Sequence, residues 1–208
     1  MNLKIKNALI SVSDKGEISS LLKILKKYNI RLISSGGTFK VIKKLGYDCT
    51  ELSKYTGFKE MLDGRVKTLH PKIHAGILHD RQNKSHKNQM SKQKFPPIDL
   101  IVVNFYPFQN VVRFSKNSKD IIENIDIGGP TLVRAAAKNF KNVAIITNKS
   151  DYTALAQEIE KYKGKTSLQF RETMSSKAFG LTAYYDSMIA NWFNNKLNIE
   201  FPDRKTIF

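Results

Sequence analysis

Short apolar runs alternate with amphipathic helical patterns along this chain, and that alternation limits its possible folds more than any other feature. Ala8–Val12, Asp99–Phe105 and Asn142–Thr147 are nearly continuous apolar runs, as expected of strands buried on both faces of a sheet. Two shorter β-type segments, Arg31–Ser34 and Asp48–Leu52, lie between the first two. Strands that alternate with helices predict an α/β fold, with a doubly wound, mostly parallel sheet and helices on both faces.

Helical patterns occupy much of the remaining chain. Glu17–Tyr28 carries its leucines on one stripe with lysines outside, while Thr38–Leu45 and Pro130–Asn139 each follow a Gly-Gly pair. A longer helical pattern spans Lys165–Asn195. The Lys-, Gln- and Asn-rich segment Arg81–Pro97 is expected to be an exposed loop. The sequence thus predicts one domain, with a single low-complexity excursion.

The charge of the chain favours anionic ligands without specifying nucleic acid. Its net charge is +17, but 28 of the 35 basic residues are Lys, spread along the whole sequence. Arg is the residue that binds phosphates and base edges in a bidentate manner, so this bias weakens the case for nucleic-acid binding. We expect no nucleic-acid partner, and we expect the charge to attract an anionic substrate.

Cysteine usage and hydropathy limit the compartment. A single cysteine, Cys49, excludes an internal disulfide framework, and no stretch reaches the ~20 apolar residues of a membrane span. The first apolar run is too short for the core of a signal peptide. We therefore expect a cytoplasmic protein without membrane attachment.

Two turns carry the composition of an anion site. Ser11–Gly16 and Ser34–Thr38 each join a predicted strand to a predicted helix, with small hydroxyls, a lysine or paired glycines. The amides of a helix N-terminus bind phosphate well, and adjacent strand ends in such a sheet lie together. The same residues also cap helices without any ligand, so both interpretations remain open. Neither turn is a Walker A loop.

Two further segments contain candidate functional groups. Within Gly64–Pro71, Arg65 and Lys67 bring two cations together, although a solvated basic loop has the same composition. The histidines that follow show no metal-binding spacing, so no metal site is expected. Tyr106 follows the fourth strand, where its hydroxyl would reach the mouth of the sheet, although core packing also accounts for aromatic residues there.

The segment Asp126–Asn139 opens a helix with Gly128, Gly129 and Pro130. Amides before a helix start can stabilise a developing oxyanion. Lys138 follows Pro130 by eight residues, about 12 Å along the axis. Its side chain is expected to lean toward the helix start, although an exposed basic face would look the same.

Together these motifs, in this order, resemble the N-terminal IMP cyclohydrolase domain of the bifunctional enzyme AICAR transformylase/IMP cyclohydrolase. The resemblance covers essentially the whole chain and is most specific in Gly64–Pro71 and Asp126–Asn139. It implies a methylglyoxal-synthase-like fold. It also implies dehydrative ring closure of 5-formamido-1-(5-phosphoribosyl)imidazole-4-carboxamide to inosine monophosphate, in de novo purine biosynthesis.

The resemblance also implies the roles of particular residues. The catalytic set would be Lys67, Tyr106, Asp126 and Lys138. Substrate binding would fall to Ser11, Ser13, Lys15, Ser35, Gly37, Thr38, Arg65, Thr68, Asn104, Ile127, Gly128 and Gly129. We expect the amides around Ile127–Gly129 to hold the oxyanion, Lys138 with Asp126 to move protons, and Lys67 with Tyr106 to polarise the formamide.

The resemblance extends to domains, cofactors and partners. Residues 1–195 are expected to form the cyclohydrolase domain, and residues 196–208 a linker toward the family's transformylase domain. No cofactor is expected for ring closure, because 10-formyltetrahydrofolate serves only the transformylase. A homodimer is expected. The alternatives are a methylglyoxal-synthase-like lyase and a ligand-sensing domain of the same fold.

Overall fold

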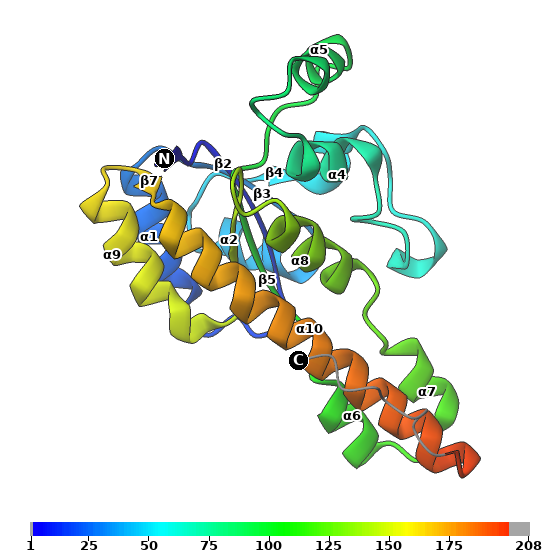
Figure 1. Ribbon diagram of the computed structural model, residues 1–208. Coiled ribbons are helices and arrows are strands. Elements are labelled where there is room, and N and C mark those ends of the chain that lie inside the picture. The colour runs from blue at the N-terminus through cyan, green and yellow to red at the C-terminus, as the bar shows by residue number, and fades with distance from the viewer. Residues whose placement is uncertain (1, 200–208) are drawn as a thin grey trace.

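A five-stranded parallel sheet forms the centre of the computed structural model, which describes residues 2–199 (Figure 1). Its strand order is β4-β3-β2-β5-β6, and every neighbouring pair is parallel. The bounds are β2 Asn7–Val12, β3 Arg31–Ser34, β4 Thr50–Glu51, β5 Leu100–Asn104 and β6 Ala144–Ile146. All five predicted strands are therefore present, and the predicted α/β class is confirmed.

The helices flank this sheet. From β2 the sheet extends to β3 and β4 on one side and to β5 and β6 on the other. Because crossovers between parallel strands are right-handed, the helices that connect strands on the two sides of β2 lie on opposite faces of the sheet. Accordingly α2 contacts β2 and β3, whereas α8 contacts β5 and β6 and packs along α10. The bounds are α1 Ile18–Lys27, α2 Gly36–Lys44, α3 Leu52–Thr56, α4 Pro71–Leu78, α5 Lys84–Lys92, α6 Phe108–Phe114, α7 Ser118–Glu123, α8 Gly128–Lys138, α9 Tyr152–Lys161 and α10 Leu168–Leu197. Two 3-10 turns, Leu62–Gly64 and Lys149–Asp151, complete the helical elements in the described part of the chain.

The segment Arg81–Pro97 differs from the expected loop, because α5 forms inside it. The Asn83 side chain accepts a 3.2 Å hydrogen bond from the His86 amide and caps this helix. Met90 is its buried anchor. The cap and the one buried apolar side chain stabilise this short helix. The polar composition of the segment gave no sign of it.

The ends of α10 also differ from the predicted pattern. Lys165 and Thr166 form β7, which pairs antiparallel with β1 (Leu3–Lys4), and Ser167 caps the helix through the Phe170 amide. At its other end α10 continues to Leu197, past the expected domain boundary at residue 195. Most of the expected linker, residues 200–208, lies outside the described residues.

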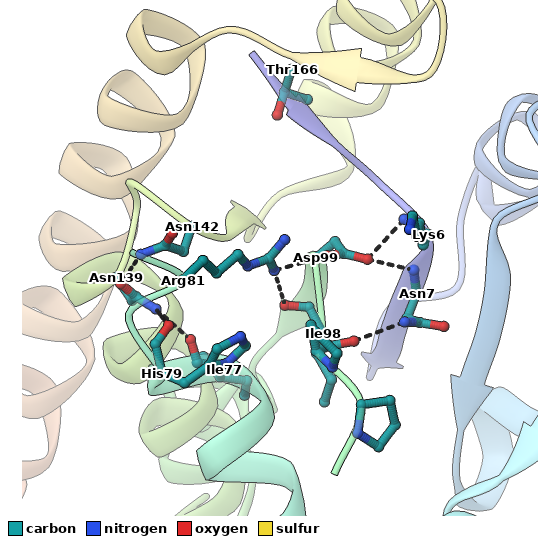
Figure 2. A network of polar contacts seen from close by, with 12 residues as sticks. Lys6, Asn7, Ile77, His79, Arg81, Ile98, Asp99, Asn139, Asn142 and Thr166 are labelled. Carbon is teal, nitrogen blue, oxygen red and sulfur yellow. Dashed lines mark hydrogen bonds and ion pairs between the residues drawn. The ribbon is translucent and has the colours of Figure 1, made fainter. Parts of the chain in front are cut away.

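A polar network ties β2 to β5 at the amino ends of the strands (Figure 2). One carboxylate oxygen of the buried Asp99 accepts hydrogen bonds from the amides of Lys6 (2.8 Å) and Asn7 (2.7 Å). The other oxygen pairs with Arg81 at 2.8 Å. This edge of the sheet is therefore closed by protein groups, whereas the carboxyl edge carries the cleft described below.

The far half of α10 extends beyond the sheet, alongside α6 and α7 (Figure 1). These three elements, called the arm below, enclose a second apolar cluster of Phe108, Ile121 and Tyr185. The arm therefore has its own small core, next to the segment that leads into α8.

Candidate functional site

A cleft of about 750 Å³ opens at the carboxyl ends of β2, β3 and β5. Turns after all three strands, the segment around Lys67 and the start of α8 line it. Every residue expected to bind substrate lies on its wall, and so do three of the four expected catalytic residues. These are Ser11, Ser13, Lys15, Ser35, Gly37, Thr38, Arg65, Lys67, Thr68, Asn104, Tyr106, Asp126, Ile127, Gly128 and Gly129.

Asn104 organises the first turn of the cleft from the end of β5. Its carbonyl oxygen accepts hydrogen bonds from the amides of Ser13 (2.5 Å) and Asp14 (3.1 Å), and its amide nitrogen donates to the Asp14 carbonyl oxygen (3.0 Å). Lys15 is held nearby, because its Nζ donates to the Ser13 carbonyl at 3.0 Å. Asn104 therefore shapes the turn that presents Ser13 and Lys15.

The N-terminus of α2 forms the second turn. Thr38 is buried, and its hydroxyl both accepts from the Val12 amide (3.1 Å) and donates to the Val12 carbonyl (3.0 Å), which fixes α2 on β2. Ser35 precedes the helix in an extended conformation, and its side chain caps none of the helix amides. Ser35 and the first residues of α2 line the cleft.

Two lysines approach this helix start from different segments. A Cβ added to Gly36 would lie 3.0 Å from Lys67 Nζ, and one added to Gly37 would lie 3.7 Å from Lys15 Nζ. Gly36 has a φ of +53°, a backbone conformation that favours glycine. Two ammonium groups beside the positive end of a helix dipole are features that favour an anionic ligand, and this place is called the anion corner below.

The segment Glu60–Lys67 is a tight hairpin. Met61 and Val66 form an antiparallel bridge, with left-handed residues in the turn between them. Lys67 Nζ pairs with Glu60 Oε2 across the hairpin at 2.8 Å. This pairing lowers the pKa of Glu60. The bridge therefore determines where Lys67 enters the cleft.

Arg65 meets Glu123 at the end of α7 in a bidentate pair, with Nε 3.0 Å from Oε1 and a second contact from Nη2 to Oε2. Sequence reasoning missed both Glu60 and Glu123. The only signal in the sequence was that two neighbouring cations, Arg65 and Lys67, need carboxylates to balance their charge. That signal does not identify which carboxylates they are.

Asp126 lies at the entrance to α8, where it is partly buried. Oδ1 accepts a 2.8 Å hydrogen bond from the Gly129 amide. Burial raises the pKa of Asp126, while the amides of Gly129 and Gly128 act against that rise. The Gly129 amide, one of the amides expected to hold an oxyanion, therefore donates to Asp126 in this structure. The assignment of the amides around Ile127–Gly129 to the oxyanion stays a prediction.

The walls on either side of Asp126 are close-packed. A Cβ added to Gly128 would lie 2.5 Å from the Thr68 hydroxyl oxygen, so the residue that follows the hairpin packs directly on the start of α8.

Tyr106 is 57% exposed at the mouth of the cleft, where its phenol can contact a ligand.

Lys138 is the one expected site residue that the structure does not bring to the cleft. It is exposed in the last turn of α8, ten positions after Gly128, which corresponds to about 15 Å along the helix axis. The helix start faces the cleft and the helix runs away from it, so the expected lean toward the glycine amides does not bridge this distance.

Among residues 2–199, no three His, Cys, Asp or Glu side chains gather as metal ligands. Within the same residues, no helix is both long and apolar enough to cross a membrane.

Two protein-family models match the sequence of this chain. The MGS-like domain matches residues 17–131, and the AICARFT/IMPCHase bienzyme matches residues 136–207. Among solved structures, one titled "Crystal structure of ForH" superposes with a TM-score of 0.81 at 28% identity, covering 91% of this chain and 99% of that chain. The MGS-like match covers most of the residues that line the cleft, apart from the first turn at residues 11–15 and Leu132.

Curated relatives agree with these matches. The chain is 47% identical over 200 residues to bifunctional purine biosynthesis protein PurH of Bradyrhizobium diazoefficiens, and 48% identical over 204 residues to the protein of that name in Persephonella marina. The alignments cover 96% and 97% of the chain, but 38% and 39% of the relatives. The chain therefore spans about two-fifths of the length of the curated relatives it matches.

Proposed function

This chain belongs to the MGS-like domain family and is homologous over nearly its whole length to PurH, and we propose that it acts as an IMP cyclohydrolase. In the proposed reaction, the carboxamide nitrogen of 5-formamido-1-(5-phosphoribosyl)imidazole-4-carboxamide attacks the formyl carbon. A C–N bond forms, a tetrahedral intermediate carries the former carbonyl oxygen, and water leaves to give inosine monophosphate.

The observation that carries the proposal is the convergence of separate motifs on one cleft with an anion corner and a partly buried carboxylate. Lys15, Lys67 and the start of α2 offer charge and amides to a phosphate. Asp126 lines the same cleft just before the start of α8. A phosphorylated ribonucleotide needs both features, since the phosphate gives affinity and ring closure needs proton transfer.

The residues of the cleft divide the chemistry as follows. An amide nitrogen is a poor nucleophile, so Asp126 accepts its proton, and the raised pKa of this carboxyl makes it a better base than an exposed aspartate. Lys67 and Tyr106 polarise the formyl oxygen and stabilise the charge that develops on it. Lys138 is assigned a part in proton transfer by the resemblance alone.

The setting of the reaction is part of the proposal. We expect no cofactor for ring closure, a cytoplasmic location, and a homodimer in solution. The net charge of +17 would draw the anionic nucleotide toward the cleft.

Ultraviolet spectroscopy of the purified chain with the formamido nucleotide tests the proposal through the appearance of inosine monophosphate. Turnover should persist after exhaustive EDTA dialysis and without folate. Asp126→Asn should abolish it, and an unchanged rate in that variant would contradict the assignment. If turnover instead required an added divalent ion, the cofactor-free reaction would be wrong.

A second candidate follows from the match of residues 17–131 to the MGS-like domain. A methylglyoxal-synthase-like lyase would use the same anion corner to release inorganic phosphate from dihydroxyacetone phosphate. Phosphate release from that substrate, without ring closure, would favour the lyase. Tight nucleotide binding without either reaction would favour a ligand-sensing domain.

A further inference from the structure

Asp126 is held from two sides, and only one of them is local. Its carboxylate engages the Gly129 amide, three residues further along the chain. Its own backbone N–H donates a 2.8 Å hydrogen bond to the phenol oxygen of Tyr185, which is 59 positions away in α10. The cleft therefore depends on a helix that contributes nothing to its wall.

The backbone at Asp126 has no regular structure to support it. Residues 124–127 link the end of α7 to the start of α8 and lie in neither helix nor strand. In such a link the direction of a side chain follows from whatever fixes the flanking peptide groups. At Asp126 the bond to Tyr185 fixes the peptide on the amino side, and the bond to Gly129 fixes the carboxylate.

Tyr185 is itself buried and packed between aromatic rings. It is 2% exposed, and its ring packs against Phe105 (centroids 4.9 Å apart) and Phe108 (6.1 Å). Phe105 directly precedes Tyr106 at the mouth of the cleft, and both Phe108 and Tyr185 belong to the core of the arm. The phenol oxygen therefore has a fixed position relative to both walls of the cleft.

We propose that Tyr185 is a positioning residue, whose phenol oxygen holds the Asp126 peptide so that the carboxylate faces the cleft. This role rests on the proposed function of Asp126 in proton transfer. Without the phenol, the Asp126 amide loses its acceptor and the link rotates to find another, which moves the carboxylate away from the Gly128 and Gly129 amides.

Two matched variants test this role. Tyr185→Phe removes only the phenol oxygen and keeps the ring between Phe105 and Phe108. Tyr152→Phe is the control, because Tyr152 is equally buried (2% exposed) and its hydroxyl has no hydrogen-bond partner. We expect Tyr185→Phe to lower kcat about tenfold with KM within about twofold, since the phosphate corner is untouched. Tyr152→Phe should leave both unchanged.

The pH dependence separates positioning from general stability. The Gly128 and Gly129 amides oppose the rise in the pKa of Asp126 that burial causes. Losing their alignment raises that pKa further, so the acid limb of the kcat profile should move to higher pH in Tyr185→Phe. A variant with a lower Tm but an unchanged kcat and acid limb would make Tyr185 a purely structural residue and would overturn the proposal.

A measurement without turnover keeps this inference distinct from the proposed function. The Asp126 carboxyl can be titrated by carbon-13 NMR in the unsubstituted chain and in Tyr185→Phe, with the higher pKa expected in the variant. Hydrogen exchange of the Asp126 amide in the unsubstituted chain covers the case in which the variant does not fold. A protected amide is expected, and a rapidly exchanging one would overturn the hydrogen bond on which the proposal rests.

Discussion

Gly129 lies so close to Asp126 that a Cβ on this glycine would overlap carboxylate Oδ2 and lie 3.0 Å from Cγ. Phe105 closes the same space from another side, with Cδ1 3.2 Å from that position. Any side chain at residue 129 therefore displaces the Asp126 carboxylate, because backbone and aromatic ring leave it no other direction.

Gly129→Ala is accordingly expected to lower kcat by about 10²-fold, the usual scale for a lost proton-transfer group. The matched control is Gly180→Ala in α10, where an added Cβ meets nothing within 4 Å. That change should raise the free energy of unfolding by about 0.5–1 kcal/mol and leave kcat unchanged. Steady-state kinetics and thermal melts of both variants test the pair, and a fully active Gly129→Ala would refute the contact.

The two lysines of the expected catalytic set should behave differently. Lys67→Ala removes an ammonium group at the anion corner, so we expect a lower kcat together with a clearly higher KM. Lys138 is outside the cleft of this chain, so we expect Lys138→Ala to change both constants less than about threefold. Steady-state kinetics decide the matter, with circular dichroism as a check on folding. A loss of kcat of about 10²-fold in Lys138→Ala would support the catalytic role that the resemblance implies for Lys138, against its position outside the cleft of this chain.

Asp99 should affect stability without affecting catalysis, because its network lies at the opposite edge of the sheet (Figure 2). Asp99→Ala leaves the Lys6 and Asn7 amides without their acceptor and Arg81 without its carboxylate. We expect a loss of about 3–5 kcal/mol in the free energy of unfolding, measured by urea titration. Asp48→Ala, which removes an exposed carboxylate 3.8 Å from Lys43, should leave Tm unchanged. An equal loss of unfolding free energy in both variants would contradict a stabilising role for the Asp99 network.

Cys49 should be unreactive in the folded chain. Burial raises the pKa of its thiol to about 11, although Lys43 acts in the opposite direction. Because the thiolate is the reactive form, little of it exists at pH 7.5, and labelling by iodoacetamide should be slow. The rate should increase as the pH rises toward 11, and unfolding in urea should restore the rate of an ordinary thiol. Complete labelling of the native chain within minutes at pH 7.5 would contradict this prediction.

The strands and the cleft edge could be predicted because their signals are local. The continuous apolar run Ala8–Val12 indicates a strand buried on both faces, and parallel strands bring their carboxyl ends to one edge. That reasoning placed Ser13 and Ser35 in the same region, and both line one cleft. The helix α5 was missed because its polar composition conceals a single cap and a single buried methionine.

The sequence by itself therefore determined the α/β class, the order of strands and helices, and the segments that meet at the carboxyl edge. Periodicity and turn chemistry depend on neighbours along the chain, and those are visible in the sequence.

Only the tertiary structure decided the hydrogen-bond partners within that edge. It assigned the Gly129 amide to Asp126, gave Lys67 to Glu60, and supplied the phenol of Tyr185 from 59 positions away. It also left Lys138 at the far end of α8. A hydrogen bond or ion pair forms only between groups that the complete fold brings within about 3 Å at a suitable angle, and no local pattern specifies that meeting.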